Sequence, residues 1–388
     1  MELPAPRAYV DVHILQTVPP ANLNRDDQGN PKEAFFGGVR RSRVSSQAWK
    51  RATRLHFTEH REPDQDQATR TRRVAAALAG RIGDTTGLDD EGAARLATAL
   101  LAPLKIRAGK KEGDTAYLFF YGHRQLDAVA ALVRDRAAEL VGLGDKALAA
   151  EMEKLPIQEV FTSGHPLDVA LFGRMVADIP ALRVDAAVQV AHALSTHAVE
   201  LEFDYFTAVD DEARKGQETG AGMIGTIGFN SATLYRYASV GLHQLRHNLD
   251  TDEDAIKGVQ SFVTSFARSV PSGYGNSFAH RTLPSLVAVV VRSDQPVNLV
   301  SAFEEPIAPG SGIAAESARQ LAKEHTKALK QWGDTPDHTA VCHAFDESSD
   351  TGSVIREAFG DAVTFPRLLT GLGEHLSSLV APSVPAAR

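Results

Sequence analysis

The chain lacks what several classes of protein need. Cys342 is its single cysteine, so no disulfide can form within the chain, and a reducing compartment is expected. His338 and His343 stand near Cys342, but one thiol without spaced partners predicts no metal site. No apolar run is long enough to span a bilayer, and the first residues lack the pattern of a secretion signal. We therefore expect a cytoplasmic protein with no metal and no membrane partner.

Motifs for cofactor and catalytic sites are also missing. The chain has no P-loop, no His-Glu-x-x-His and no spaced cysteine pairs. Residues 220–225 match the dinucleotide-binding pattern, but that pattern should follow a strand and open a helix. Here it follows a charged loop and precedes 229–237, which has the composition of a strand. We therefore predict no cofactor.

Two pairs of adjacent acids, Asp26–Asp27 and Asp210–Asp211, are the best candidates for catalytic carboxylates. Paired acids can hold a metal or transfer protons. Adjacent aspartates point in different directions, however, and both pairs lie in loops, where Asp is common in turns. The sequence thus favours a protein that is not an enzyme.

The distribution of charge is more informative than its sum. The 388 residues carry a formal net charge of −8, which argues against binding nucleic acid over the whole surface. A local basic groove is still compatible with that balance. The segment 37–54 contains no carboxylate, and it holds the cations Arg40, Arg41, Arg43, Lys50, Arg51 and Arg54.

This basic segment has the order of parts that binds phosphate. A glycine pair, a basic strand and the step Ser45–Ser46 precede a helix, whose first N–H groups can face an anion. Gln47, Lys50 and Arg51 share one helix face with Arg54, whereas Ala48, Ala52 and Leu55 should face the core. A solvated amphipathic helix is the alternative. The joined strand, hydroxyls and helix favour an extended chain of phosphates.

The rest of the chain predicts an α+β fold. Residues 9–15 alternate as a half-buried strand, and strand character returns at 233–238 and 286–291, with a helix at 253–268 between them. Alanine-rich helical stretches fill 60–185, for example 72–82, 91–101 and 125–140. A ferredoxin-like core with an inserted helical part is the simplest arrangement. Thr233, Tyr235 and Tyr237 share one strand face, and core packing is the better interpretation of the tyrosines.

A polar, glycine-rich stretch at 207–228 is too long for a tight turn. Loops of this length in compact domains are usually functional or disordered. Aromatic and apolar residues stand at both of its ends, Tyr205 and Phe206 before it and Met223 and Ile224 within it. The pattern indicates an arm that packs against something outside its own core, and a mobile loop with hydrophobic anchors is the alternative.

Ordered blocks along the chain resemble a known family, the CasC or Cse-type backbone subunit of Cascade, the RNA-guided type I-E CRISPR surveillance complex. The blocks that carry the resemblance are 23–27, 36–51, 168–175, 191–197, 206–211 and 235–238. The resemblance implies a hand-like arrangement: a palm with a modified RNA-recognition-motif fold, an inserted helical fingers domain and an extended thumb loop. The palm then takes 1–58, 186–198 and 232–388, the last with a C-terminal tail; the fingers take 59–185 and the thumb 199–231.

The resemblance also implies the binding residues. The guide backbone should be held by Arg25, Ser45, Ser46, Gln47, Lys50 and Arg51, with Arg40, Arg41 and Arg43 close by. Met175 from the fingers, and Tyr205, Phe206, Thr207 and Ile224 from the thumb, should wedge at a kink in the guide.

The implied function is a non-enzymatic, cytoplasmic RNA-binding subunit in antiviral defence. Copies of it form a helical filament along the CRISPR RNA, kink the guide periodically and present it for pairing with target DNA. The expected partners are the guide, further copies, other Cascade subunits and, through the guide, target DNA. The alternative is a subunit that cleaves target RNA, as in type III complexes, using Asp26 or Asp27. A pure protein scaffold is disfavoured by the basic segment.

Overall fold

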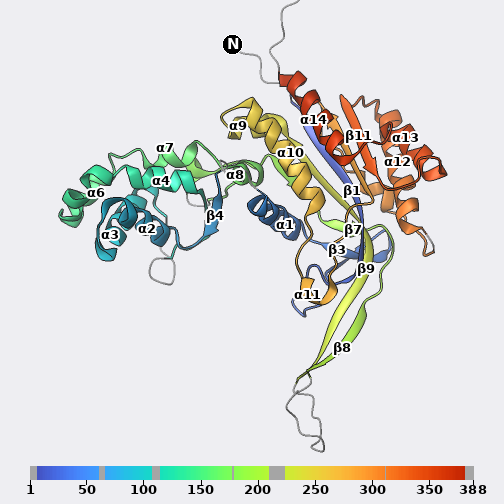
Figure 1. The fold of residues 1–388 in the computed structure, drawn as a ribbon, viewed down its shortest axis with the longest axis horizontal. Helices are drawn as coiled ribbons and strands as arrows, with labels where there is room; N and C mark the ends of the chain where they lie inside the picture. Colours follow the sequence, from blue (N-terminus) through green and yellow to red (C-terminus); the bar gives the residue numbers. More distant parts are fainter. Residues whose placement is uncertain are drawn as a thin grey trace, which may run out of the picture. The chain divides into compact units, whose positions relative to one another are not determined.

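The computed structural model describes residues 7–60, 66–106, 114–176, 179–208, 223–310 and 312–380. The chain divides into two compact units (Figure 1). Unit 1 comprises Met1–His56, Gln189–Ser239 and Val259–Arg388, and unit 2 comprises Phe57–Val188 and Val240–Gly258. Unit 2 thus contains the predicted helical segment 59–185, and it also takes 240–258, which the prediction gave to the palm.

Unit 1 is built on a sheet in the order β11-β10-β1-β9-β7-β3-β2, with β6 and β8 pairing with β9. The pairs β1–β10, β10–β11, β2–β3, β3–β7, β7–β9 and β8–β9 are antiparallel. The strands are β1 (Tyr9–Ala21), β2 (Glu33–Phe36), β3 (Val39–Val44), β6 (Val188–Val190), β7 (Ala193–Ser195), β8 (Glu202–Ala208), β9 (Met223–Gly241), β10 (Leu286–Arg292) and β11 (His338–His343).

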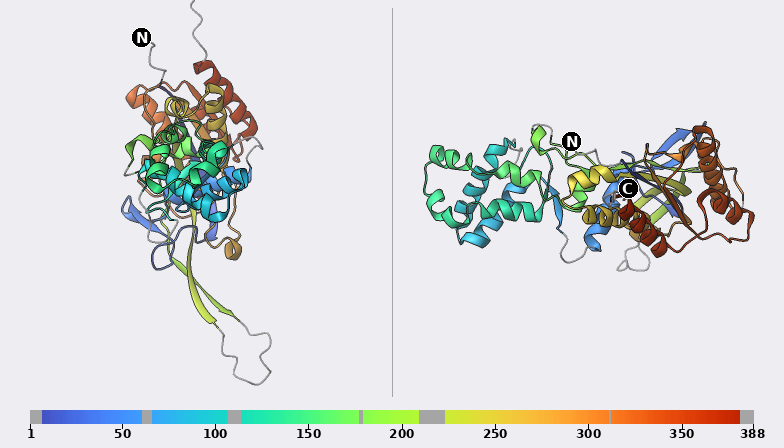
Figure 2. Two further views of the ribbon diagram at one scale, coloured as in Figure 1. Left: turned by 90° about the vertical axis from the view of Figure 1, so that its left-hand side faces the viewer. Right: turned by 90° about the horizontal axis from the view of Figure 1, so that it is seen from above.

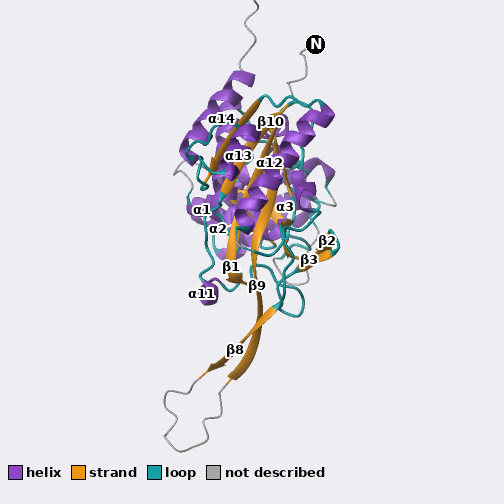
Figure 3. Ribbon diagram, turned by 90° about the vertical axis from the view of Figure 1, so that its right-hand side faces the viewer, coloured by secondary structure: helices purple, strands orange, loops and turns teal. Residues whose placement is uncertain are grey.

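Helices cover both faces of this sheet. On one face lie α12 (Ile313–Trp332), α13 (Asp350–Phe359) and the short η4 (Leu299–Phe303) (Figure 3). On the other lie α1 (Ser46–Glu59), the unit 1 part of α10 (Asp252–Arg268), and α14 (Phe365–Val380). A further short helix, α11 (Gly275–Phe278), precedes β10.

This double cover corrects the prediction of a half-buried strand at 9–15. Val10, Val12 and Ile14 are buried, but Asp11 and His13 on the opposite face are buried as well. The prediction for α1 also needs correction, because its buried residues are Trp49, Ala52 and Thr53, whereas Leu55 is 43% exposed. A buried face of a strand or helix can carry polar residues when these residues bond to partners elsewhere in the chain. The sequence then wrongly indicates an exposed face.

The side chains of β9 alternate between the two helical layers. Tyr235 and Tyr237 pack in the core with α12 and α13, as expected for core tyrosines. Arg236 points the other way and is buried. Its guanidinium lies 3.7 Å from the ring centroid of Trp49 and 4.6 Å from that of Phe266, which places it between α1 and α10.

Among the residues that the structure describes, no carboxylate pairs with the Arg236 guanidinium. Its Nη1 donates to Gln16 Oε1 at 2.6 Å, and its Nη2 donates to the carbonyl of Phe266. Burial lowers the pKa of Arg236 to about 9. The aromatic faces and neutral oxygens must therefore stabilise this cation.

A second buried polar group joins β1, β9 and β10. The Asp11 carboxylate accepts from Tyr237 Oη at 2.8 Å and lies 3.3 Å from Arg292 Nε. Burial raises the pKa of Asp11 to about 6 despite these partners. On α12, the buried His325 stacks on Phe359 with ring centroids 4.5 Å apart, and burial lowers its pKa to about 4.

Unit 2 is mainly helical (Figure 2). Its two-stranded sheet pairs β4 with β5. Its elements are β4 (Ala68–Thr71), α2 (Val74–Thr86), α3 (Asp90–Leu101), η1 (Ala102–Leu104), β5 (Phe119–Gly122), α4 (His123–Ala131), η2 (Arg134–Arg136), α5 (Ala137–Val141), α6 (Asp145–Met152), α7 (Ile157–Thr162), α8 (Leu167–Phe172), η3 (Pro180–Leu182) and α9 (Leu242–Asn248). The helix predicted at 125–140 is divided into α4, η2 and α5, which lets Val133 and Ala137 both pack in the core.

The predicted α+β class is confirmed, whereas the ferredoxin-like character of the palm stays a prediction. The helix expected at 253–268 is α10, and the strands expected at 233–238 and 286–291 lie in β9 and β10. None of the helices within the described ranges is long and apolar enough to cross a membrane.

Replacing Arg236 should test how strongly the sheet depends on it. Arg236→Ala leaves a cavity between Trp49 and Phe266 and removes the donor from Gln16, so we expect unit 1 to lose about 3 kcal/mol of stability. Urea unfolding followed by tryptophan fluorescence measures this loss. Lys327→Ala is the control, since its exposed pair with Glu324 at 3.7 Å should contribute less than about 0.5 kcal/mol. Equal effects of the two substitutions would contradict the assigned role.

The pKa of His325 predicts a loss of stability in acid. Its folded pKa of about 4 lies below the ordinary 6.5. The contribution of neutral His325 to the free energy of unfolding is therefore complete above about pH 6.5 and is lost as the pH falls through 4. Between about pH 7 and pH 4, His325 should lower the free energy of unfolding of the wild-type protein by up to about 3 kcal/mol. We expect His325→Leu to lack this part of the decrease. The measurement is the urea midpoint at several pH values.

Asp11 provides a test of opposite sign. Because the pKa of Asp11 is raised, the contribution of its protonated form to the free energy of unfolding is complete below the ordinary pKa of 3.8. This contribution is lost as the pH rises through about 6. Asp11→Asn should therefore make the acid-induced fall in stability steeper, whatever its effect at neutral pH. A shallower fall would show that Asp11 is not the group that gains a proton.

Candidate nucleic-acid interface

The predicted glycine pair forms the turn between β2 and β3. Gly37 and Gly38 have φ values of 59° and 78°, the left-handed pair that a two-residue hairpin turn requires. A Cβ on Gly37 would also lie 1.6 Å from the carbonyl oxygen of Glu304, so the position excludes any side chain. The pair therefore shapes the hairpin, and the basic strand β3 follows from it.

Arg41 must be removed from the predicted binding residues. Its side chain is buried, and its guanidinium donates to the carbonyls of Phe36, Ser195 and Phe303 at 3.1, 3.0 and 2.8 Å. Alternation along β3 turns Arg41 into unit 1, whereas Arg40 is exposed. Arg41 holds the hairpin to the neighbouring segments and cannot reach a ligand without breaking these bonds.

Arg40 and Arg43 remain near the surface, but each already has a partner. Arg40 Nη1 lies 2.6 Å from Glu33 Oε2, and its guanidinium lies over the Phe35 ring. Arg43 Nε donates to the Glu33 carbonyl, and its Nη1 lies 3.1 Å from His192 Nδ1. Glu33 is on the adjacent strand β2, which explains why the basic segment looked free of carboxylates. A half-exposed pair of this kind is weak enough for a phosphate to replace it.

The two serines at the start of α1 have different roles. Ser45 Oγ accepts from the N–H of Ala48 at 3.3 Å, which makes Ser45 the N-cap. Its own N–H donates to Asn24 Oδ1 at 2.9 Å. The N–H groups of Ser46 and Gln47 have no protein acceptor within the described residues. The first turn of α1 contains no acidic residue, so its N–H groups can bind an anion.

Gln47, Lys50 and Arg51 form the exposed or half-exposed side of α1 next to this turn; we call them the α1 polar face. Lys50 and Arg51 make no ion pair within the described part of the chain. Burial lowers the pKa of Lys50, and no carboxylate among the described residues raises it. Such an unpaired, partly desolvated ammonium is stabilised by an incoming anion.

Trp49 fixes the orientation of this face. It is fully buried, and it packs edge-on against Phe266 with ring centroids 6.4 Å apart. Because Trp49 holds α1 against the sheet, Lys50 and Arg51 must project from the helix on its outer sides.

The loop after β1 carries Arg25 and the acidic pair. Arg25 is exposed, and its guanidinium lies 4.7 Å from the ring centroid of Tyr274. Asp26 Oδ1 accepts from the N–H groups of Gln28 and Asn30, both at 2.9 Å. Asp26 therefore stabilises a turn. The described residues hold no cluster of acidic, histidine or cysteine side chains that could bind a metal.

The described part of the predicted thumb is the antiparallel β8–β9 hairpin (Figures 1 and 3). Tyr205 is 75% exposed and Phe206 is 37% exposed. Because Tyr205 and Phe206 are consecutive in a strand, their side chains project from opposite faces of the hairpin. They therefore cannot both contact the same base from one side. The register pairs Thr207 with Ile224. Asp210 and Asp211 lie outside the described residues.

Phe206 has a defined position on its face. It pairs with Gly225, and a Cβ on that glycine would lie 2.1 Å from Phe206 Cζ. The ring thus covers the glycine, an arrangement known to stabilise glycine within strands. On the other face Phe203, which the sequence interpretation did not assign, is 60% exposed beside Tyr205.

Met175 belongs to unit 2 and is 84% exposed. The residues on either side of it, Arg174 and Val176, are buried. Arg174 Nε donates to the Leu182 carbonyl at 2.7 Å, and its Nη2 donates to that of Phe161. Burial lowers the pKa of Arg174 to about 10. Two buried anchors therefore hold an apolar side chain out in solvent, where it is free to contact a partner.

These observations define a mixed α/β protein with an antiparallel sheet and helices on both of its faces. Near its start, the helix α1 carries cations that make no ion pair in the described part of the chain. Residues 10–369 match the family of CT1975-like proteins, and the chain belongs to this family. A search of curated proteins finds no match.

Two solved structures are similar over nearly the whole chain. A chain of a "CRISPR RNA-guided surveillance complex, pre-nicking" has 32% identity and a TM-score of 0.80, covering 95% of this chain and 100% of that one. A chain of another "CRISPR RNA-guided surveillance complex" has 29% identity and a TM-score of 0.71, covering 94% of this chain and 99% of that one.

The different roles of the two serines can be tested by matched substitutions. Ser45→Ala removes the cap of α1 and should cost about 1 kcal/mol of stability. Ser46→Ala should cost almost nothing, because the Ser46 hydroxyl has no protein partner among the described residues. Thermal unfolding of the two variants measures the difference. A larger effect at Ser46 would reverse the assignment of the cap.

Proposed function

We propose that the chain is the guide-binding backbone subunit of a type I-E, Cse-type Cascade complex. Several copies assemble along one CRISPR RNA, kink it at regular intervals and present its bases for pairing with target DNA. The observation that carries this proposal is the α1 polar face, where Lys50, Arg51 and the N–H groups of Ser46 and Gln47 have no partner among the described residues. The resemblance to chains of CRISPR RNA-guided surveillance complexes supports the same role.

The order of the strands supports an RNA-recognition-type palm. Along the chain, β1 is followed by α1, then by β7 and β9, then by α10 and β10. In space these strands lie in the order β10-β1-β9-β7. A ferredoxin-like β-α-β-β-α-β unit has this arrangement of strands and helices. The β2–β3 hairpin is an addition to that unit, and its strand β3, which carries Arg40 and Arg43, leads directly into α1.

The contacts in this site are independent of base identity. Cations, hydroxyls and backbone N–H groups recognise phosphate, and phosphate contacts position a strand without reading its sequence. A protein that must accept any spacer needs this property, because Watson–Crick pairing with the guide then reads the target. Arg25, Arg40 and Arg43 extend the site along the backbone, and Arg40 and Arg43 exchange their protein partners for phosphate.

In this proposal, the β8–β9 hairpin inserts at the kink of the guide RNA and interrupts the stacking of its bases. Tyr205 and Phe206 offer aromatic surface on opposite faces of the hairpin, so one can stack on a base while the other contacts protein. Met175 offers a further apolar side chain from unit 2. Thr207 and Ile224 stay predicted members of the wedge.

No reaction is part of this proposal, and cleavage of the target belongs to another protein. The use of Asp26 Oδ1 as a turn acceptor supports a structural role for this aspartate. Incubation of the assembled complex with complementary RNA and Mg²⁺ tests the point. Regularly spaced cuts that are lost in Asp26→Ala or Asp27→Ala would contradict the non-enzymatic proposal.

The double variant Lys50→Ala/Arg51→Ala tests the phosphate contacts. Affinity for guides of unrelated sequence should fall by the same factor, and the slope of log affinity against log salt should decrease by about 0.7 for each lost contact. Fluorescence anisotropy over a salt series gives both quantities. Lys327→Ala on α12 is the matched control and should change neither. A loss restricted to one spacer sequence would contradict the proposed contacts.

A further inference from the structure

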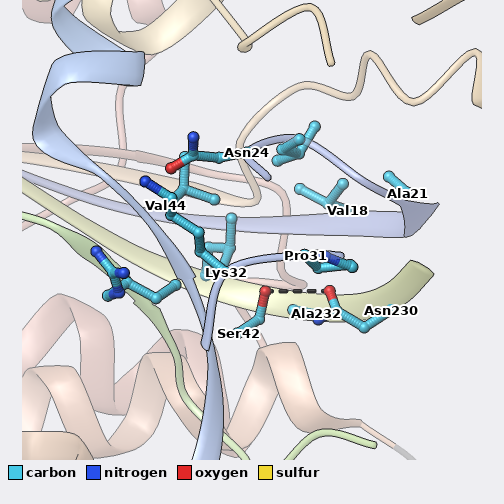
Figure 4. Close-up of a pocket in the computed structure, with 12 residues that line it drawn as sticks. Val18, Ala21, Asn24, Pro31, Lys32, Ser42, Val44, Asn230 and Ala232 are labelled. Carbon is cyan, nitrogen blue, oxygen red and sulfur yellow. Dashed lines mark hydrogen bonds between the residues drawn. The ribbon is translucent and has the colours of Figure 1, made fainter. Parts of the chain in front are cut away.

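A small polar pocket lies where β1, β3 and β9 meet (Figure 4). Its polar lining residues are Asn24, Lys32, Ser42, Arg43 and Asn230, and aliphatic side chains make up the remainder. The free volume is about 10 Å³. That is room for about one water molecule or one hydroxyl group. The pocket is therefore too small for a base or a phosphate.

The polar atoms of the pocket are incompletely paired. Asn230 is 6% exposed, and its Oδ1 accepts from Ser42 Oγ at 3.1 Å (Figure 4). Its Nδ2 is buried and has no acceptor among the described residues. Ser42 Oγ, which donates its only proton to Asn230, can still accept a hydrogen bond. One buried donor and one acceptor thus remain, and this is the pattern that a hydroxyl group satisfies.

The pocket adjoins the proposed phosphate site. Asn24, which lines the pocket, accepts from the N–H of Ser45 and so connects it to the N-cap of α1. Lys32 and Arg43 provide positive charge beside it, and Lys32 makes no ion pair within the described ranges. A nucleic-acid strand whose phosphate lies at the start of α1 brings an adjacent sugar to this place.

We propose that the pocket binds a ribose 2′-hydroxyl group, so that each copy of the chain distinguishes an RNA guide from DNA. This inference rests on the proposed function, and it adds to it a preference for the sugar. The hydroxyl accepts from Asn230 Nδ2 and donates to Ser42 Oγ. A deoxyribose leaves the buried amide unpaired, which makes its binding weaker. A 2′-O-methyl group is larger than the space available and is excluded by its size.

The test uses the full-length protein and four single strands of one sequence that differ only at the 2′ position: hydroxyl, hydrogen, fluorine and O-methyl. Anisotropy titrations at one salt concentration give the affinity for each. We expect the deoxy strand to bind about tenfold more weakly than RNA, with the fluoro strand between them. We expect the O-methyl strand to bind no better than the deoxy strand. Equal affinity for RNA and the O-methyl strand would overturn the inference.

Two variants locate the effect. Asn230→Leu keeps the number and branching of the side-chain heavy atoms and removes the amide, so it should bring the RNA-to-DNA ratio close to one. Ser42→Ala serves the same purpose if Asn230→Leu fails to fold. Lys50→Ala/Arg51→Ala is the control, because it should weaken binding to all four strands and leave their ratios unchanged. Unchanged ratios in both pocket variants would mean that the pocket holds only a water molecule.

The outcomes separate the inference from the function it rests on. If the wild-type protein binds none of the four strands, with no dependence on salt, the proposed function fails. If it binds them in a salt-dependent manner but without preference for the 2′-hydroxyl, only the inference about the pocket fails.

Discussion

The arrangement of unit 1 depends on one buried cation, Arg236, held between two aromatic rings. Trp49 belongs to α1 and Phe266 to α10, so the guanidinium joins both helices to β9. Trp49 is followed directly by Lys50 and Arg51, and a helix that is fixed at Trp49 presents these two residues in a fixed direction. The position of the proposed phosphate site is therefore determined in the hydrophobic layer beneath it, by a residue that no ligand touches.

Strand β9 connects this layer to the other parts of the proposed interface. It carries Arg236 in the core, Asn230 at the small pocket and Gly225 beneath Phe206 in the hairpin. The strand is continuous from Met223 to Gly241. The proposed contacts with successive parts of a guide are thus positioned by one run of backbone. A change in the twist of that strand would move the pocket and the hairpin together.

The sequence predicted the class of the fold and proposed a place for the phosphate site. Periodicity located β1, β10 and α10, and the basic segment pointed to α1. It could not give the direction of each side chain. In the sequence, nothing distinguishes Arg41 from its neighbour Arg40. In the structure, Arg41 donates to the carbonyls of Ser195 and Phe303 and is therefore a structural residue. The residues next to Arg41 in the sequence do not indicate such distant partners.

Other residues were missed for the same reason. Tyr274 lies over Arg25, and Glu33 pairs with Arg40, but each comes from a separate segment. Phe203 had a weak signal, since it is two residues before Tyr205 and therefore on the same strand face. The small pocket combines β1, β3 and β9, and only the register of the sheet brings Ser42 and Asn230 together.

The contact between Arg40 and Glu33 has a consequence for how the number of phosphate contacts is measured. Salt dependence counts the cations that a nucleic acid releases when its phosphates are neutralised, and a carboxylate set free in the same step takes up cations again. In the proposed complex, Arg40 would exchange the Glu33 carboxylate for a phosphate, and Glu33 would then attract a cation. A count of contacts from the salt slope will therefore fall below the number of arginines that touch the strand.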